Sequence, residues 1–566
     1  MGKRRERAAA ASHREILPRT ADSAGPGQVS HHREHLVLAV CFVYAVFLSV
    51  FGIANHAFWD DEANTALFGR NLLASGELTA FDGVNVAGYR EGAELDENLH
   101  NTYMPSLQYY VTAGAFALLG QGTFAGRIPF VVAGLLAIVA MALWVRWHLA
   151  GRIPVWLPIF IASVMPAWLL YMRQCRYYAL GALFTFVLLA AWARVGSSRR
   201  EDVLATLAGG TATAALWWTS YLNAASAMVM LPLFYALPAY RRPEKHRFLA
   251  VVYAVTIICG MYVYLVKNPY AAAVAETDAL PGLERYAILA WRHLRDFGTM
   301  EFLPVCLLPV LALPYLAGRW RELRPLARDG IVLCGAMLAA SAVIVAFTPQ
   351  PVTITRYADM RYAVPLILVG AAVTSICIII LWKAAWPIGA VAAALVVFTN
   401  LLTLSWAIVP HVPLRSTLAA YMIDISTNYR TGNEAVIETV KALPKGSTVL
   451  ILPPFMAYSA MFYAPEYRYV DQLPDSKPFR PELRAKIPGH VFNQHARPDF
   501  VLTAYEPKEV IGQLEDHFDG ETWRLVRILK DDWADGTRPE ITLHSFGPPP
   551  PHPLSHGMAL YQASAH

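Results

Sequence analysis

Charged residues are scarce in this sequence. Only 16% of its 566 residues are charged, against about 25% in an average soluble protein, and 56% are hydrophobic. This balance excludes an ordinary soluble protein. Aromatic residues make up 12% of the chain, which suits rings placed at the two interfaces between lipid and water. The composition therefore predicts an α-helical polytopic membrane protein.

Patterns that bind metals, nucleotides or nucleic acids are also missing. The six cysteines lie in or beside apolar runs and none follows residue 377, so they form neither a disulfide framework nor a zinc spacing. The C-terminal region has no glycine-rich nucleotide motif and no P-loop. The net charge of +5 says little about nucleic acid. The C-terminal region is therefore not expected to hold ATP or a nucleotide sugar.

Apolar runs long enough to cross a bilayer recur along the first 410 residues. There are about eleven, each near the ~20 residues that a membrane-spanning helix needs. We therefore assign residues 35–410 to a transmembrane domain. The runs are 35–57, 127–148, 153–171, 177–195, 203–219, 221–239, 248–266, 301–317, 330–348, 361–382 and 385–409.

Basic residues indicate the orientation of these spans. The tail 1–34 begins with a basic cluster, and its distance from the first apolar run indicates a disordered tail rather than a cleaved signal peptide. By the positive-inside rule, the side that carries this tail and the basic loops is the cytoplasm. The long loop 58–126 is then external, and an odd number of spans leaves the C-terminal region external too. The basic loops are 146–152, 194–200, 241–247, 319–328 and Lys383.

Three consecutive acids follow the first apolar run. Asp60, Asp61 and Glu62 open the stretch FWDDEANTALFGRNLLASGEL at 58–78, which has the apolar spacing of an amphipathic helix on the membrane surface. A carboxylate at that depth can act as a general base or bind a cation beside a lipid-borne substrate. The alternative is that these acids only solvate the loop.

Further along the same external loop, a second polar cluster precedes a second apolar segment. The segment 105–119 is too short to span comfortably, so we interpret it as another surface helix. The cluster before it either forms a solvated turn or supplies ligands for a metal or a phosphate. Its members are Asp96, Glu97, His100 and Tyr103.

Arginine, lysine and tyrosine residues gather at the external rim. Arginine offers a planar fork that suits phosphate, so Arg176 with Tyr177 and Arg361 with Tyr362 are candidates to bind a lipid phosphate or a sugar. Arg176 can instead be a snorkelling interface anchor.

The external loop 267–300 is rich in basic residues, which runs against the charge bias of external loops. Lys267 and His293 in this loop are candidates to contact a bound anion such as a polyprenyl phosphate. Acids of the same loop can compensate the charge equally well.

From residue 411 the composition becomes that of a soluble domain. A helix is expected at 431–443, followed by short strands, so we predict an external α/β domain at 411–546 and a proline-rich flexible tail at 547–566. The expected strands are 448–452, 468–470, 499–503, 525–529 and 541–544.

The stretch W-x-D-E followed by LLASGEL resembles the first external loop of GT-C membrane glycosyltransferases, the protein O-mannosyltransferase and aminoarabinose lipid A transferase relatives. Weaker likenesses follow in the family's order: P-x-L-x-Y-Y at 105–110, Gly126-Arg127, and R-Y-x-x-P at 361–365. The resemblance implies a GT-C fold with Asp61 as the catalytic base and Glu62 beside it. Asp60 is kept as a further candidate. Where the aminoarabinose branch has Thr-Arg after the acids, Ala63 and Asn64 stand here, which would move that arginine's role to Arg70 or Arg176.

The resemblance also implies a function at the bacterial inner membrane. An inverting glycosyltransferase would move a sugar from a polyprenyl-phosphate donor to a glycolipid, lipopolysaccharide, glycan or protein acceptor. No cofactor is required with certainty, and a divalent metal stays open. Two alternatives remain: a polysaccharide polymerase or ligase that uses a lipid-linked oligosaccharide, and a transporter of lipid-linked sugars. A transporter would show internal repeats and buried charges near the bilayer midplane, which we do not see.

Overall fold

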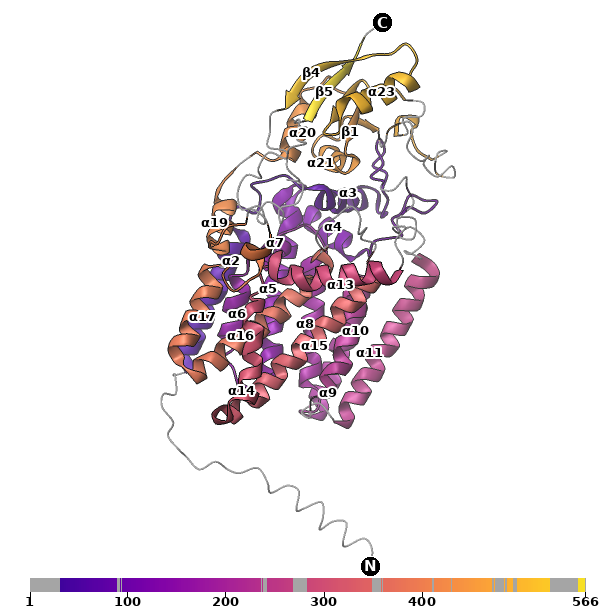
Figure 1. Ribbon diagram of the computed structural model, residues 1–566. Coiled ribbons are helices and arrows are strands. Elements are labelled where there is room, and N and C mark those ends of the chain that lie inside the picture. The colour runs from indigo at the N-terminus through magenta and orange to yellow at the C-terminus, as the bar shows by residue number, and fades with distance from the viewer. Residues whose placement is uncertain are drawn as a thin grey trace, which may run out of the picture.

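The computed structural model shows a bundle of helices with a smaller α/β domain above one end (Figure 1). It describes residues 31–88, 92, 94–235, 237, 242–267, 282–348, 358, 360–409, 412–428, 430–470, 473, 483, 486–491, 496–529 and 558–564.

The bundle is built from apolar helices, as expected of a polytopic membrane protein. Four helices are long and apolar enough to cross a membrane, and the other apolar helices of the described residues are shorter, so the count of eleven spans stays a prediction. The bundle helices are α2 (His31–Val50), α5 (Thr123–His148), α6 (Trp156–Ser163), α7 (Pro166–Met172), α8 (Tyr178–Arg194), α9 (Arg199–Trp217), α10 (Tyr221–Tyr235), α11 (Pro243–Tyr262), α15 (Arg324–Phe347), α16 (Val364–Ala384) and α17 (Trp386–Phe398).

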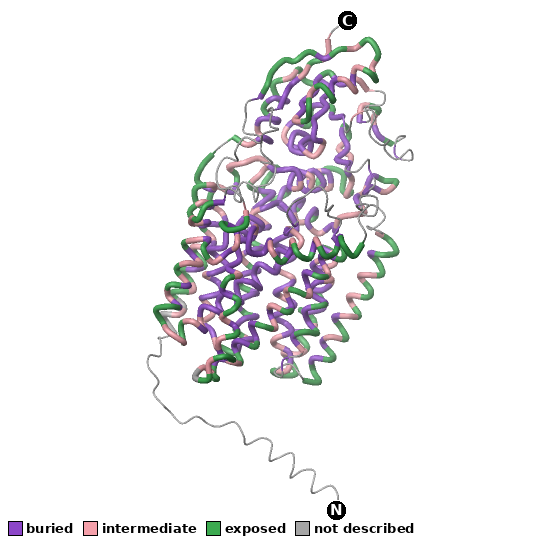
Figure 2. Tube along the Cα trace, in the orientation of Figure 1, coloured by how far each residue is buried: buried purple, intermediate pink, exposed green. Residues whose placement is uncertain are grey.

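Burial separates the centre of the bundle from its edge. In α16, 89% of the most apolar stretch is buried, whereas in α11 only 11% is buried. Figure 2 shows α11 exposed along the edge of the bundle, where its apolar side chains would face lipid. Ile257, Ile258 and Leu265 are exposed apolar residues of this region, as expected of side chains in contact with lipid.

Two predicted spans are broken at prolines. The run at 153–171 forms α6 and α7, which meet just before Pro166. The run at 301–317 forms a 3-10 helix, Val305–Ala312, and the short helix α14 (Leu313–Leu316), with Pro309 and Pro314 inside them. Proline lacks the amide hydrogen that an α-helix needs, so each run changes direction instead of crossing as one helix.

Three helices lie between the bundle and the α/β domain (Figure 1). Two of them, α3 (Asp60–Ser75) and α4 (Leu107–Leu119), were predicted as surface helices. The third, α13 (Gly282–Thr299), replaces part of the predicted loop 267–300. Its buried residues Arg285, Leu289, His293 and Asp296 recur at helical spacing. Charged residues on that buried face hid the pattern.

The α/β domain contains a five-stranded sheet in the order β2-β1-β3-β5-β4. The expected helix is present as α20 (Gly432–Lys441), and α19 (Thr417–Ser426) precedes it. Two more helices of this domain are α21 (Ala457–Tyr463) and α23 (Pro507–His517). Four expected strands are found, whereas 541–544 lies outside the described residues. The strands are β1 (Thr448–Leu452), β2 (Arg468–Val470), β3 (Phe500–Thr503), β4 (Trp523–Leu529) and β5 (Met558–Ala563).

Strand β5 corrects the expectation of a flexible tail at 547–566. It pairs antiparallel with both β3 and β4, so the end of the chain is inserted inside the sheet. The short apolar run Met558 to Leu560 is buried there. The prolines before this run are typical of an extended tail, but the run itself is long enough for a strand.

The packing of α5 against the segment before α3 can be tested by adding a methyl group at Gly126. A Cβ atom on Gly126 would come within 2.5 Å of Cζ of the fully buried Phe58 ring. We expect Gly126→Ala to lower the free energy of unfolding by about 1–3 kcal/mol, because the ring must shift within a packed site. Thermal unfolding of the purified protein in detergent measures this.

Gly114→Ala on α4 is the matched control. A Cβ there would meet no atom within 4 Å. Alanine favours a helix over glycine by about 1 kcal/mol, so this variant should unfold at the same or a slightly higher temperature. Equal losses in the two variants would contradict the packing described here.

Candidate active site

Asp61 lies in the first turn of α3, between two arginines from distant parts of the bundle. Its Oδ2 atom is 2.5 Å from Arg361 Nη1, and its Oδ1 atom is 3.4 Å from Arg176 Nη2. Arg176 also donates from Nη1 to the Asp61 carbonyl at 3.1 Å and to Thr65 Oγ1 at 2.9 Å. The structure thus brings together three residues that the sequence offered as separate candidates.

This cluster is only partly open to solvent. The Asp61 side chain is 23% exposed, Arg361 is 18% exposed and Arg176 is 8% exposed. Burial is the largest influence on Arg176 and opposes its charge, but the carboxylate of Asp61 and the neighbouring tyrosines together raise the pKa of the guanidinium. Two guanidinium groups against one carboxylate leave a net positive centre beside a reachable carboxylate.

Glu62 has a different environment from Asp61, although the two are adjacent. Its side chain is fully buried and accepts two hydrogen bonds from Arg127, at 2.8 and 2.6 Å. It also accepts the amide of Cys175 at 2.7 Å. A carboxylate enclosed in this way holds α3 against α5 and the turn before α8. These contacts give Glu62 a structural role, and its part in catalysis stays a prediction.

Asp60 also serves the start of α3. It is 8% exposed, and its Oδ1 atom accepts the amide of Asp61 at 2.7 Å. A carboxylate in the first turn of a helix satisfies amides that have no partner inside the helix. Asp60 therefore orients the turn that carries Asp61.

Aromatic rings line the two arginines. The Arg176 guanidinium lies 5.8 Å from the ring centre of Tyr177, and that of Arg361 lies 5.5 Å from the ring centre of Tyr362. The amide of Tyr177 donates to Gln108 Oε1 on α4 at 3.2 Å. These contacts place both predicted tyrosines at the site, where they support the arginine forks.

Two further tyrosines at the site were not expected. Tyr109 on α4 and Tyr178 at the start of α8 lie close enough to Arg176 to interact with its charge. Both rings are fully buried, and neither the Tyr178 hydroxyl nor Arg176 Nε has a hydrogen-bond partner among the described residues. Burial raises the pKa of Tyr109, so its hydroxyl keeps its proton. The doublets at 109–110 and 177–178 were the only signal in the sequence.

Arg70 lies away from Asp61 and has another role. Its guanidinium donates to the carbonyls of Met461 and Phe462 at the end of α21, both at 3.2 Å, and to Asp82 at 3.0 Å. It therefore joins α3 to the α/β domain. Of the two arginines considered for contact with phosphate, Arg176 is the one beside Asp61.

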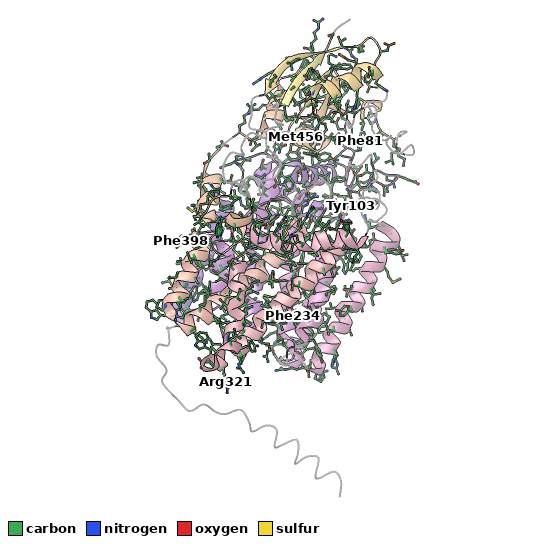
Figure 3. The ribbon with its side chains drawn as sticks, viewed as in Figure 1. Phe81, Tyr103, Phe234, Arg321, Phe398 and Met456 are labelled. Atoms are coloured by element: carbon green, nitrogen blue, oxygen red, sulfur yellow. The ribbon has the colours of Figure 1, made fainter. Side chains whose placement is uncertain are left out.

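The second polar cluster forms a turn. The Oδ1 atom of Asp96 accepts the amides of Asn98 and His100 at 2.8 and 2.9 Å, and its Oδ2 atom is 3.3 Å from His100 Nδ1. The carbonyl of Glu97 accepts a hydrogen bond from Lys486 of the α/β domain. Tyr103, labelled in Figure 3, lies between the bundle and that domain. Within the described residues, no group of three or more His, Cys, Asp or Glu side chains could hold a metal ion.

Lys267 and His293 lie at different places on the rim. Lys267 ends the π-helical turn Val263–Lys267 and lines an open, mostly apolar cavity of about 260 Å³, close enough to Asp96 to interact with its charge. His293 is 1% exposed on the buried face of α13. The other residues that line the cavity are Pro105, Ser106, Trp217, Trp218, Tyr221, Ile258, Cys259, Tyr262 and Val263.

Asp296 on α13 holds the backbone that leads to Arg361. Its side chain is fully buried and pairs with Arg295, at 2.6 Å between Nε and Oδ1. Its Oδ2 atom accepts the amide of Ala358 at 2.7 Å, three residues before Arg361. The neighbouring rim residues Arg356 and Asp359 lie outside the described residues.

The different environments of Glu62 and Asp61 can be tested by comparing the stability of two variants. Glu62→Gln leaves Arg127 as an uncompensated buried charge, so we expect a loss of about 3–5 kcal/mol in the free energy of unfolding. Asp61→Asn also takes a carboxylate away from a buried arginine, Arg176, but its side chain is 23% exposed where that of Glu62 is fully buried, so we expect a smaller loss. Thermal unfolding in detergent compares the two, and an Asp61→Asn protein as unstable as Glu62→Gln would contradict this division.

Comparison with known proteins finds likeness at the level of structure. No protein-family model matches the chain, and no curated protein matches it by sequence. ArnT from Cupriavidus metallidurans, solved bound to undecaprenyl phosphate, is similar with a TM-score of 0.49 and 15% identity over 85% of this chain and 94% of that one. The Archaeoglobus fulgidus oligosaccharyltransferase, in complex with Zn and sulfate, has a TM-score of 0.48 and 12% identity over 85% of this chain and 69% of its own.

Proposed function

We propose that this chain is a membrane glycosyltransferase that moves a sugar from a polyprenyl-phosphate donor to an acceptor hydroxyl on the external face. The observation that carries the proposal is Asp61, a partly exposed carboxylate held between Arg176 and Arg361 where the bundle meets the α/β domain. A base and two phosphate-binding groups at one point are what this reaction needs.

Asp61 serves as the general base. It removes the proton from the acceptor hydroxyl as that oxygen forms a bond to the anomeric carbon. The bond from this carbon to the phosphate oxygen breaks, and the phosphate leaves with the electron pair. Because attack and departure occur on opposite faces of the sugar, the anomeric configuration is inverted.

Arg176 and Arg361 stabilise the leaving phosphate. Without substrate, both guanidinium groups face the Asp61 carboxylate, which occupies donors that also suit a phosphate. When the donor binds, its phosphate competes for these hydrogen bonds. The contacts move from Asp61 to the phosphate, and Asp61 becomes a stronger base for the acceptor proton.

The unpaired hydroxyl of Tyr178 supports a ligand site at this point. A buried polar group without a partner costs about 1–3 kcal/mol, so proteins rarely keep such groups. Here the Tyr178 hydroxyl and Arg176 Nε both lie at one charged centre. A phosphate or sugar would supply the oxygen atoms that these donors lack.

The cavity beside Lys267 suits the lipid part of the donor. Its lining is mainly aromatic and aliphatic, and it opens between the ends of α9 and α11 and the start of α10. A polyprenyl chain could pack there from the lipid phase while Lys267 offers a positive charge at the rim. The sugar and the acceptor are chosen by contacts that these residues do not specify.

Asp61→Asn should reduce sugar transfer by at least about 100-fold, because a general base contributes on the order of 10²–10⁴-fold to the rate. Transfer from synthetic polyprenyl-phosphate sugars to acceptors in proteoliposomes measures this. Asp96→Asn is the matched control, since its carboxylate lies in the same external loop but closes a turn. A variant Asp61→Asn with wild-type activity would exclude Asp61 as the base.

Tyr178→Phe should lower activity without lowering stability. The hydroxyl has no partner in the part of the chain that the structure describes, so its removal should leave the unfolding temperature unchanged or slightly higher. If the hydroxyl binds the substrate, the catalytic efficiency kcat/KM should fall about tenfold, which corresponds to the net value of one hydrogen bond to a charged group. Unchanged kcat/KM would show that the substrate does not use Tyr178.

A further inference from the structure

The α/β domain forms hydrogen bonds with the backbone just before Asp61. Just before α3, the amide of Phe58 donates to Tyr463 Oη at 3.0 Å, and the carbonyl of Phe58 accepts from Ser459 Oγ at 2.5 Å. Tyr463 and Ser459 lie one turn apart on α21. Both hydrogen-bonding groups of this peptide residue are therefore paired with side chains of the α/β domain.

The preceding residue is held from two sides. The amide of Ala57 donates to Glu434 Oε1 on α20 at 3.0 Å, and its carbonyl accepts from Arg127 Nη2 on α5 at 3.2 Å. The α/β domain thus fixes one side of the segment and the bundle fixes the other.

Tyr463 lies where these parts meet. Its hydroxyl is 2.6 Å from Thr123 Oγ1 at the start of α5, in addition to its bond with Phe58. The ring of Phe58 packs 5.1 Å from Phe462 and 5.9 Å from Tyr463, centre to centre. Burial raises the pKa of Tyr463 to about 12, so the hydroxyl remains protonated and both hydrogen bonds persist at neutral pH.

We infer that Tyr463, assisted by Ser459, is a positioning residue that sets the place of Asp61 relative to Arg176 and Arg361. The inference rests on the proposed function. Asp61 is three residues beyond Phe58, and only the extended Trp59 and the first turn of α3 lie between them. Since both arginines belong to the bundle, a displacement of Phe58 moves the carboxylate but not the arginines. The α/β domain is in this view an integral part of the active site.

The test compares two tyrosines of α21. Tyr463→Phe removes the hydroxyl that holds Phe58, whereas Tyr458→Phe removes one that donates to the Gly88 carbonyl at 2.6 Å. We expect Tyr463→Phe to lower kcat about tenfold or more, because a displacement of about 1 Å can cost on the order of 10²-fold. The KM for the polyprenyl-phosphate sugar should change less than about twofold, since the arginines remain in place. Tyr458→Phe should keep kcat within about twofold of wild type.

Ser459→Ala provides a second variant in case Tyr463→Phe does not fold. It frees the Phe58 carbonyl and should lower kcat with an unchanged KM in the same way. Wild-type kcat in both variants would overturn the inference, and so would an equal loss in Tyr458→Phe.

A labelling experiment tests the inference without measuring sugar transfer. In a Cys306→Ser background, which removes the exposed native thiol, Asp61→Cys carries a thiol whose labelling rate by a small methanethiosulfonate reports its position. Adding Tyr463→Phe should change this rate severalfold, and adding Tyr458→Phe should not. An unchanged rate would refute the positioning role. A changed labelling rate, together with a wild-type protein that transfers no sugar from any polyprenyl-phosphate donor, would retain the positioning role and reject the proposed function.

Discussion

The buried ion pair between Glu62 and Arg127 is the interaction on which the site depends. A carboxylate with no exposure is stable in a protein interior only when its charge and its lone pairs are satisfied. Arg127 provides two hydrogen bonds to Glu62 and three more to the carbonyls of Ile53, His56 and Ala57. The end of the first span, the start of α3 and the start of α5 are thereby joined at one point.

Because Glu62 holds α3 in place, Asp61 is not needed for that ion pair. Asp61 is one residue away from Glu62 but points to two arginines instead of one, and part of its surface remains open. Arg176 arrives from the turn before α8, and Arg361 arrives from the segment before α16. Adjacent acids thus divide structure and chemistry, because successive residues of a helix face directions about 100° apart.

The local features of this arrangement could be predicted from the sequence. Helical periodicity indicated α3 and α20, and short apolar runs indicated β1 and β3. The pairing of the charged residues at the site was missed, because their partners lie far along the chain. Glu62 and Arg127 are 65 residues apart, and Asp61 and Arg361 are 300 apart, so no local pattern reveals which acid pairs with which arginine. The same limit explains why Arg70 was considered for the phosphate and why β5 was taken for a flexible tail.

The central claim is that Asp61 occupies arginine donors that are meant for a phosphate. The most direct test is the affinity of undecaprenyl phosphate for the wild-type protein and for Asp61→Asn in lipid nanodiscs. If the carboxylate competes with the phosphate, the neutral variant should bind the lipid about tenfold more tightly, a difference of about 1.4 kcal/mol, although its sugar transfer is strongly reduced. Equal or weaker binding by Asp61→Asn would contradict the account.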